Sequence, residues 1–374
     1  MSKELLYLIS IFLIFNLLIF IKINSKLTKL SKSILQDTQN INDLKKIINN
    51  HFFNTKTKKL IKSEISNNLV NKDYNEKNDI FNEDTKQYYK KLQKLFCQDN
   101  NIFMNPFVEK EIKAVKIDIN KISFKMFVYR KNDRVSNSIL INKNYDLKGI
   151  INILNALDYY SKKNKIKKKN IYILDIGANI GWFSLIIGKN GYNVIAFEPS
   201  QTNYYILKKN FCLNKELDIT LINKGIYNEE KNCTLYYDLL NVGDGILFCG
   251  NNKFNQTNYY FENIKLTKLS NYITYLKDKN LAFIKIDVEG SELKAIESGI
   301  DLIIKYHIPF IYLEFNQILL KKNGSSPELL LRIFQNNGYQ FSIIDFLSKN
   351  YLSIEDLIKN QFINIYIIYS GIIE

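Results

Sequence analysis

The residues best suited to chemistry follow two apolar segments near the middle of the chain. Asp175 and Gly177 lie where the first segment ends, in the string DIGANIG, and Glu198 ends the second, in the string FEPS. Glycine allows the backbone to turn tightly and to approach a ligand without a Cβ atom. An acidic side chain about 20 residues further on is placed to accept hydrogen bonds from a ribose diol. The pattern therefore predicts a site for a nucleoside-containing ligand.

The turn itself narrows the choice of that ligand. A dinucleotide fingerprint reads G-x-G-x-x-G, whereas this chain reads G-A-N-I-G, with Asn179 in place of the middle glycine. The Asn179 side chain would obstruct a pyrophosphate, and the turn contains no P-loop lysine. The remaining nucleoside without phosphates is S-adenosylmethionine, whose sulfonium charge suits Asp175 and Glu198. A helix expected to begin near Gly181 would offer free N–H groups to it.

Further carboxylates follow a later apolar segment, in the string IKIDVEG. Lys285 and Asp287 share one face of the expected strand, Glu289 follows in the turn, and Glu314 ends the neighbouring strand. Asp287 and Glu289 are the catalytic candidates. Asp287 could act as the base for an acceptor hydroxyl, or share a divalent, Mg²⁺-type metal ion with Glu289 or Glu314. The structural alternative is that Asp287 caps the following helix and Glu289 orders the loop.

These motifs need a sheet that brings strand ends together. Short apolar segments alternate with segments of helical spacing, which predicts an α/β fold with a mostly parallel sheet. Right-handed crossovers then place the C-terminal strand ends at one edge, where ligands bind. His307 precedes the fifth strand, at the opposite edge, and His51 lies far upstream, so neither is expected to be the base. The string YYDLLNVGDGILFCG, with Gly243 and Gly245, is expected to be a flexible loop that closes over the ligand edge.

Three ordered motifs resemble a known family. The strings ILDIGANIGWFSLIIGKNGYNVIAFEPSQTNYYILKKN, INKGIYNEE and FIKIDVEGSELKAIESG are similar to FkbM-type methyltransferases, and the likeness covers about residues 121–315. The resemblance implies a class I (Rossmann-like) fold and S-adenosylmethionine-dependent methyl transfer, usually to a hydroxyl of a sugar or natural product. It also implies that the cofactor is held by Asp175, Gly177, Asn179, Gly181 and Glu198.

The acceptor is therefore expected to be a small-molecule or glycan hydroxyl. Residues 171–374 carry 19 Lys and Arg against 21 Asp and Glu, a charge of −2. The first 170 residues carry the other 33 basic and 16 acidic residues, a charge of +17, so they account for the whole net charge of +15. A nucleic-acid partner is not expected, because phosphate binding needs a basic surface. A nucleic-acid methyltransferase and a non-catalytic, membrane-tethered binding module remain the two alternatives.

Residues 1–24 are expected to be an uncleaved membrane anchor. Residues 5–21 read LLYLISIFLIFNLLIFI, with Ser10 and Asn16 as polar breaks, and extended to residue 23 they can cross about 30 Å of hydrocarbon. A cleaved signal peptide usually has a shorter apolar region and a small-residue cleavage site. More lysines follow the segment than precede it, which favours a single-pass protein with its catalytic domain in the cytosol.

Residues 25–106 are expected to form a stalk and linker before a methyltransferase domain at 107–374. Heptad-like spacing of Ile and Leu predicts either a short coiled coil, through which a homo-oligomer could form, or an amphipathic helix lying on the bilayer or on the domain. One further helix is expected near residues 88–96. The four cysteines show no CxxC or metal-ligand spacing, which argues against a zinc module and a disulfide scaffold and favours a reducing compartment.

Overall fold

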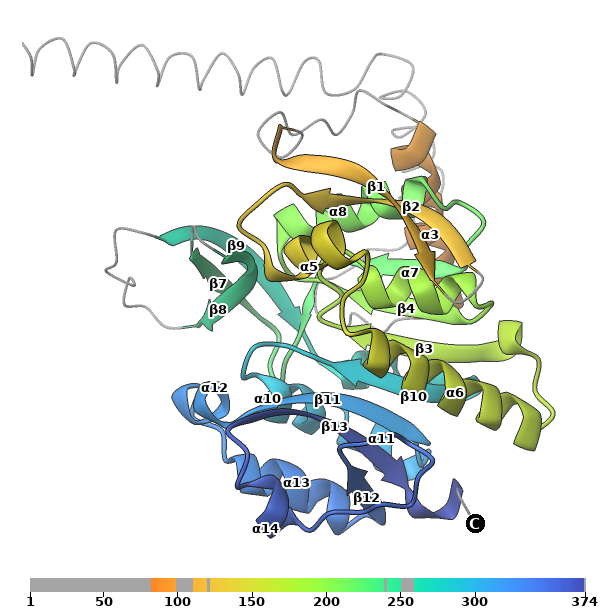
Figure 1. Ribbon diagram of the computed structural model, residues 1–374, viewed down its shortest axis with the longest axis vertical. Coiled ribbons are helices and arrows are strands. Elements are labelled where there is room, and N and C mark those ends of the chain that lie inside the picture. Colours follow the sequence, from red (N-terminus) through yellow and green to blue (C-terminus); the bar gives the residue numbers. More distant parts are fainter. Residues whose placement is uncertain (1–81, 99–109, 120–121, 239–240, 250–258, 373–374) are drawn as a thin grey trace, which may run out of the picture. The chain divides into compact units, whose positions relative to one another are not determined.

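The computed structural model describes residues 82–98, 110–119, 122–238, 241–249 and 259–372. The predicted anchor and most of the predicted stalk lie outside these ranges. Within them, every helix is too short or too polar to cross a bilayer. The described residues belong to one compact unit, Lys77–Glu374 (Figure 1).

A seven-stranded sheet forms the centre of this unit. Its strands are β3 (Ile171–Ile176), β4 (Asn193–Phe197), β5 (Ile219–Ile222), β10 (Asn280–Ile286), β11 (Phe310–Asn316), β12 (Tyr339–Ser342) and β13 (Phe362–Tyr369). They are ordered β12-β13-β11-β10-β3-β4-β5. The strands from β11 to β5 are parallel, and β13 pairs antiparallel with both β11 and β12. The prediction of an α/β fold with a mostly parallel sheet is confirmed.

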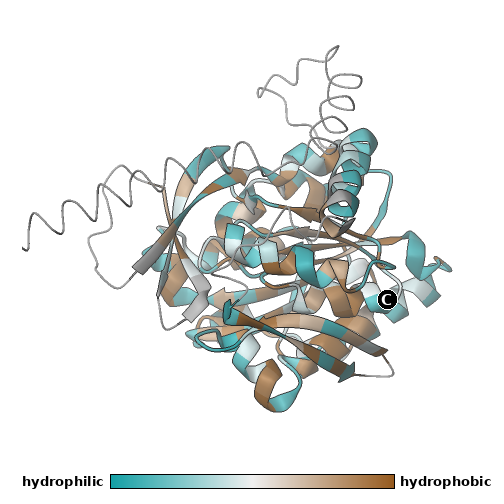
Figure 2. Cartoon of the chain, turned by 90° about the horizontal axis from the view of Figure 1, so that it is seen from above, coloured by the Kyte–Doolittle hydropathy of each residue, from teal (hydrophilic) through white to brown (hydrophobic). Residues whose placement is uncertain are grey.

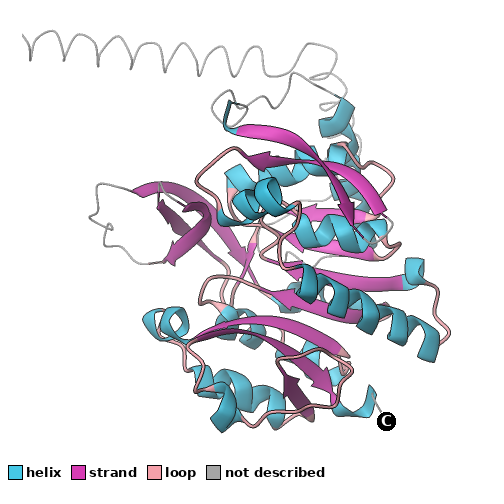
Figure 3. Ribbon diagram, in the orientation of Figure 1, coloured by secondary structure: helices cyan, strands magenta, loops and turns pink. Residues whose placement is uncertain are grey.

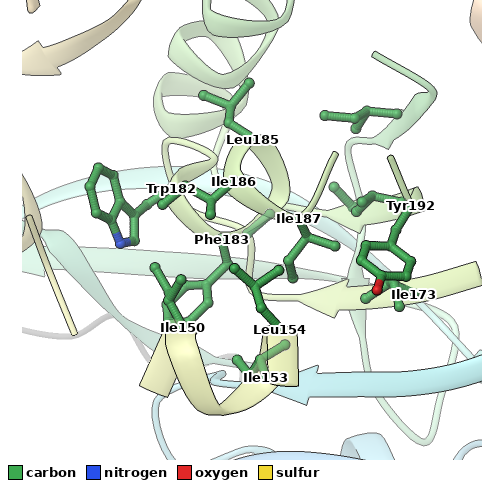
Figure 4. Packing of buried hydrophobic residues seen from close by; sticks show 14 of the residues in the cluster. Ile150, Ile153, Leu154, Ile173, Trp182, Phe183, Leu185, Ile186, Ile187 and Tyr192 are labelled. Atoms are coloured by element: carbon green, nitrogen blue, oxygen red, sulfur yellow. The ribbon is translucent and has the colours of Figure 1, made fainter. Parts of the chain in front are cut away.

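Helices cover both faces of the sheet. From residue 134 onward the structure describes helices α5 (Arg134–Asn142), α6 (Leu147–Lys163), α7 (Trp182–Lys189), α8 (Gln201–Cys212), α9 (Ile273–Leu276), α10 (Glu292–Glu297), α11 (Ile300–Lys305), α12 (Gln317–Lys322), α13 (Pro327–Gln335) and α14 (Ile354–Leu357), with short 3₁₀ turns at Lys168–Asn170, Leu269–Tyr272 and Ser370–Ile372. Val194 and Ala196 of β4 pack into one hydrophobic cluster with α6, α7 and α8, while Ile195 and Phe197 pack into another with α10, α11 and α13. The strands are accordingly largely hydrophobic in Figure 2, and Figure 4 shows side chains of α6 and α7 lying together with Ile173 of β3.

A second sheet occupies the place of the predicted flexible loop (Figure 3). It consists of β6 (Gly225–Ile226), β7 (Lys231–Asp238), β8 (Asn241–Phe248) and β9 (Tyr259–Thr267), in the order β6-β9-β7-β8. The prediction of a loop is wrong because most of the segment pairs as β7 and β8. Gly245 serves packing rather than flexibility, since an added Cβ would lie 2.6 Å from Cγ of Leu235. We call β6–β9 the small sheet.

Two N-terminal elements pack on this core. The hairpin of β1 (Ile112–Ile119) and β2 (Ile122–Tyr129) contributes Phe124 and Met126 to the cluster that contains Trp182. Helix α3 (Glu83–Gln98), which confirms the helix predicted near residues 88–96, contacts α8 and the edge strand β5. A helix over an edge strand protects its unpaired backbone groups. The compact unit therefore begins upstream of the predicted boundary at residue 107.

The prediction of reduced cysteines is wrong, because all four are paired. Cys97 of α3 bonds to Cys212 of α8, with the Cα atoms 5.3 Å apart, and Cys233 of β7 bonds to Cys249, with the Cα atoms 4.6 Å apart. The partners are 115 and 16 residues apart in the chain. No local spacing could reveal them, since the docking of α3 on α8 and the pairing of β7 with β8 bring them together.

Removing the long-range bond should destabilise the protein more than removing the short-range one. The double variant Cys97→Ser/Cys212→Ser is expected to lose about 4 kcal/mol of unfolding free energy and Cys233→Ser/Cys249→Ser about 3 kcal/mol, because a longer closed loop constrains the unfolded chain more. Urea unfolding of the two variants measures both values. Finding four reactive thiols in unreduced protein purified from its source cells would contradict both bonds.

Candidate active site

A cavity of about 240 Å³ opens at the C-terminal ends of the parallel strands, against the small sheet. Gly177, Asn179, Glu198, Asp287 and Glu289 all line it, although they come from three different strand ends. The parallel sheet thus brings together five of the predicted site residues. We call this space the active-site cavity.

The turn after β3 explains why glycine and asparagine occupy it. Gly177 and Asn179 have φ angles of 83° and 51°, in the left-handed region that asparagine tolerates better than most side chains. A Cβ added to Gly177 would lie 1.8 Å from the carbonyl oxygen of Asp287. Glycine is therefore required for the ends of β3 and β10 to approach each other, and Gly177 lines the cavity without a side chain.

Glu198 is a buried acceptor at the end of β4. It is 4% exposed, and it accepts hydrogen bonds from the backbone N–H groups of Asn179, at 2.7 Å, and Ser200, at 2.9 Å. Burial raises the pKa of Glu198 to about 7, against the opposing effect of the two backbone hydrogen bonds. A glycine without a side chain beside a buried carboxylate fits a nucleoside with a ribose diol, so these residues suit S-adenosylmethionine.

Lys285 connects the cofactor turn with the acids of β10. Its side chain is 4% exposed, and its Nζ atom lies 3.1 Å from Oδ2 of Asp287 and 3.7 Å from Oδ1 of Asp175. It also donates a hydrogen bond of 3.1 Å to the carbonyl of Gly177. Burial by itself lowers the pKa of Lys285, but Asp287 and Asp175 outweigh burial and raise it. The ammonium group therefore stays charged, and its three oxygen neighbours offset the cost of burying it.

Two predicted cofactor residues, Asp175 and Gly181, do not line the cavity. Asp175 is 1% exposed and accepts a 2.6 Å hydrogen bond from the Ser184 hydroxyl of α7. Gly181 is the N-cap residue of α7, where an added Cβ would meet the side chain of Leu207. Both residues hold the turn in place, so any effect they have on a ligand passes through the turn or through Lys285.

Asp287, Glu289 and Glu314 form an acidic cluster in the cavity wall. Each offers one carboxylate oxygen, and the three oxygens lie within 4.8 Å of one another. Burial, followed by the negative charges of Asp287 and Glu289, raises the pKa of Glu314 to about 11. Glu314 therefore keeps its proton at neutral pH. Asp287, whose side chain is 30% exposed, is the member of the cluster that pairs with Lys285, at 3.1 Å.

The structural alternative for Asp287, a helix cap, is not observed. The N-cap residue of α10 is Ser291, and the cap has no side-chain hydrogen bond. The turn is ordered instead by Glu292, which is fully buried and accepts hydrogen bonds from the N–H groups of Val288, at 3.2 Å, and Gly290, at 3.1 Å. Glu289, predicted as an alternative to order this loop, lines the cavity. The sequence analysis did not identify Glu292 as the residue that orders this turn, although Glu292 lies only five residues after Asp287 in the chain.

Two further parts of the wall were not predicted. Arg134 and Val135, at the start of α5, and Tyr145, just before α6, all line the cavity. The Tyr145 carbonyl accepts a 2.7 Å hydrogen bond from the Trp182 indole. Burial, followed by the charge of Asp287, raises the pKa of Tyr145, so its hydroxyl stays protonated. These residues lie well before β3 in the chain, and only the packing of α5 and α6 brings them to the site.

His307 lies away from the active-site cavity, as predicted. It stacks on Tyr369 with ring centroids 4.3 Å apart and lines a different cavity, of about 260 Å³, together with Tyr160 and Lys279. His51 lies outside the described residues. The acids are therefore the candidates for a base in the part of the chain that the structure describes.

The family comparison agrees with this geometry. Residues 175–341 match the model of the methyltransferase FkbM domain. The match begins at Asp175 and includes Glu198, Lys285 and the acidic cluster. This region is an FkbM methyltransferase domain.

Several solved structures are similar to the chain at low identity. WbdD is 12% identical with a TM-score of 0.36, over 59% of this chain and 39% of that chain, so the match covers less than half of WbdD. The METTL16 MTase domain is 12% identical (TM-score 0.34; 71% and 88% covered), and precorrin-6y C5,15-methyltransferase from Geobacter metallireducens is 11% identical (TM-score 0.32; 60% and 88% covered). Such TM-scores carry no argument about the acceptor. No curated protein matches the chain.

Replacing Glu198 should weaken cofactor binding without unfolding the protein. Each hydrogen bond to a charged group contributes about 1.5–3 kcal/mol, so Glu198→Ala is expected to weaken S-adenosylmethionine binding at least about tenfold. Because the ionised carboxylate is the better acceptor and its pKa is about 7, affinity should fall as pH drops through that value. Isothermal titration between pH 6 and about 8.5 tests both effects.

Glu198→Gln is the matched control for the pH dependence. It keeps the shape of the side chain but cannot titrate, so only the titration of the ligand's own amino group should remain. Circular dichroism shows whether each variant is folded. Unchanged affinity in folded Glu198→Ala would remove Glu198 from the cofactor site.

Proposed function

We propose that the protein methylates a hydroxyl of a sugar, glycan or small metabolite, with Asp287 as the general base. One observation carries the proposal. The Asp287 carboxylate pairs with Lys285 at 3.1 Å and lines the same cavity as Gly177 and Glu198, instead of capping α10. A base is thereby held beside the residues that fit the cofactor.

Each residue of the site has a distinct part in the reaction. S-adenosylmethionine, when bound, supplies a methyl group on a positively charged sulfur. The turn at Gly177 and the carboxylate of Glu198 bind and orient the nucleoside. Asp287 accepts the proton of the acceptor hydroxyl, which makes the oxygen a better nucleophile. Lys285 keeps Asp287 oriented, and Glu314, protonated at neutral pH, does not compete for that proton.

The acidic cluster supports a second version of the same reaction. Three carboxylate oxygens within 4.8 Å of one another suit a hard divalent cation such as Mg²⁺. Such an ion would lower the pKa of a bound hydroxyl. Glu314 would have to release its proton to become a ligand. A metal ion therefore requires a deprotonated Glu314, whereas a direct base does not.

The lining of the cavity favours a small acceptor over a nucleic acid. Among the described lining residues, Arg134 is basic, whereas Glu198, Asp287 and Glu289 are acidic and Glu314 is held protonated. A polyanionic strand would need the opposite balance of charge. The same acids argue against a binding module without activity, since simple ligand retention gives no reason to bury Lys285 beside a partly exposed carboxylate.

Asp287→Asn should abolish most of the activity while leaving the cofactor site intact. Removing the charge but not the shape is expected to lower methyl transfer by about 10²–10⁴, the range of general-base assistance. The assay follows labelled methyl from S-adenosylmethionine into glycan, small-molecule and RNA fractions of an extract of the source cells. S-adenosylmethionine affinity should change far less.

Asp301→Asn, an exposed position on α11, is the matched control and should behave as wild type. A chelator separates the two versions of the reaction, because a direct base needs no ion. Turnover of folded Asp287→Asn within a few-fold of wild type would refute the role of Asp287, and label in RNA alone would refute the acceptor class.

The proposal extends to the location of the protein. Residues 1–24 would anchor the chain in a membrane, and the stalk would offer a contact between copies. Although the flanking lysines favour a cytosolic catalytic domain, the two disulfides support the opposite side, because disulfides persist in oxidising compartments.

Membrane extraction and thiol labelling test this location. The full chain should need detergent for extraction, whereas a chain without residues 1–24 should not. In membranes opened without reductant, a maleimide should label none of the cysteines until a reductant is added. Labelling of all four before reduction would place the domain in the cytosol instead.

A further inference from the structure

The small sheet forms one wall of the active-site cavity. Leu235 and Tyr237 of β7, Leu247 of β8, and Ile264 and Leu266 of β9 all line it. Among the side chains that the structure describes, the hydrophobic cluster of the small sheet contains five buried residues, all of them on β7 and β9. Its position therefore depends on the contacts that join it to the rest of the domain.

Glu262 of β9 makes several polar contacts of this kind. It is 7% exposed, and its carboxylate accepts hydrogen bonds from the N–H of Gln201, at 2.7 Å, from the hydroxyl of Ser200, at 3.3 Å, and from the hydroxyl of Thr202. The hydroxyl of Tyr237 lies 3.5 Å away. A second bond of 3.1 Å runs from the Gln201 side chain to the backbone of the small sheet. Glu262 therefore joins the small sheet to the first turn of α8.

Ser200 links this contact to the cofactor site. Its hydroxyl donates to Glu262, while its backbone N–H donates to Glu198 at 2.9 Å. Ser200 also caps α8 by accepting a hydrogen bond from the N–H of Asn203. The helix end is thus capped without Glu262, whose negative charge adds a favourable interaction with the helix dipole. Glu262 does not line the cavity, so it touches neither cofactor nor acceptor directly.

We propose that Glu262 is a positioning residue for the cofactor: it fixes the small sheet against α8 and, through Ser200, holds Glu198 in its binding orientation. Docking of the small sheet and binding of S-adenosylmethionine are then coupled, and each stabilises the other. The inference rests on the cofactor site alone and does not depend on which acceptor is methylated or on Asp287.

The coupling has an electrostatic consequence that a purely structural contact lacks. The charged and titratable groups that face Glu198 are Glu262 from β9, Lys285 from β10 and Tyr237 from β7. Besides burial, the negative charge of Glu262 contributes to the raised pKa of Glu198. Removing that charge should lower the pKa of Glu198 and move the pH midpoint of cofactor binding to a lower value.

Glu262→Gln in the full-length protein tests the inference by cofactor binding, without any acceptor. At a pH of about 8.5, where Glu198 is ionised in both proteins, the variant should bind S-adenosylmethionine about three- to tenfold more weakly, because charged hydrogen bonds to Ser200, Gln201 and Thr202 are lost. The pH midpoint of binding should also fall. Hydrogen exchange should show that S-adenosylmethionine protects β7 and β9 in wild type and less so in the variant.

Two further variants keep the test decisive. Glu229→Gln, an exposed position before β7 that pairs with Lys231, is the matched control and should match wild type. Thr202→Val removes one donor to Glu262 and should shift affinity in the same direction by less, which serves if Glu262→Gln does not fold.

Unchanged affinity and midpoint in folded Glu262→Gln, or in Thr202→Val if the former does not fold, would overturn the inference, even if the melting temperature fell. Failure of the cofactor site itself is recognised separately, because Glu198→Ala would then also bind as wild type.

Discussion

The buried ammonium group of Lys285 is the interaction on which the rest of the site depends. It contacts Asp175 at the end of β3, the carbonyl of Gly177 in the cofactor turn and Asp287 at the end of β10. Three segments that carry negative or partly negative oxygens would repel one another at this distance without it. Replacing it by an apolar side chain would leave two carboxylates without a counter-charge in a poorly solvated place, which costs several kcal/mol. One cation thus allows the turn that binds the cofactor and the carboxylate proposed as the base to lie side by side.

The same closeness constrains the backbone. A Cβ on Gly177 would clash with the carbonyl oxygen of Asp287. The turn that approaches the nucleoside is therefore in direct contact with the end of the strand that carries the base. The acidic side chains around that contact differ in their burial and in their neighbours. Glu292 is buried and orders a turn, Glu314 is held protonated, and Asp287 is left partly exposed beside a cation. Residue type alone does not distinguish these carboxylates, and their surroundings assign them different chemistry.

Features set by residues close together in the sequence could be predicted, whereas features set by contacts between distant segments could not. Strands such as β4 are short apolar segments followed by turn residues, and a parallel sheet collects their ends, so Gly177, Glu198 and Asp287 could be placed in one cavity. The disulfides, the wall formed by α5 and Tyr145, and the small sheet could not be placed, because each depends on contacts between distant segments. The cap role weighed for Asp287 was plausible by position, and only the geometry of Glu292 and Lys285 decided against it.

The bond between Cys97 and Cys212 has a mechanical meaning for a chain held at its N-terminus. A pull on that end would reach the domain through α3 and could peel this helix only as far as Cys97. Beyond that point the load passes directly into the end of α8, and the intervening segment, which contains the hairpin of β1 and β2 and the turn at Gly177, lies inside a covalent loop that bears no tension. If the chain is anchored as proposed, the disulfide would carry the load, and the turn that approaches the ligand would keep its shape.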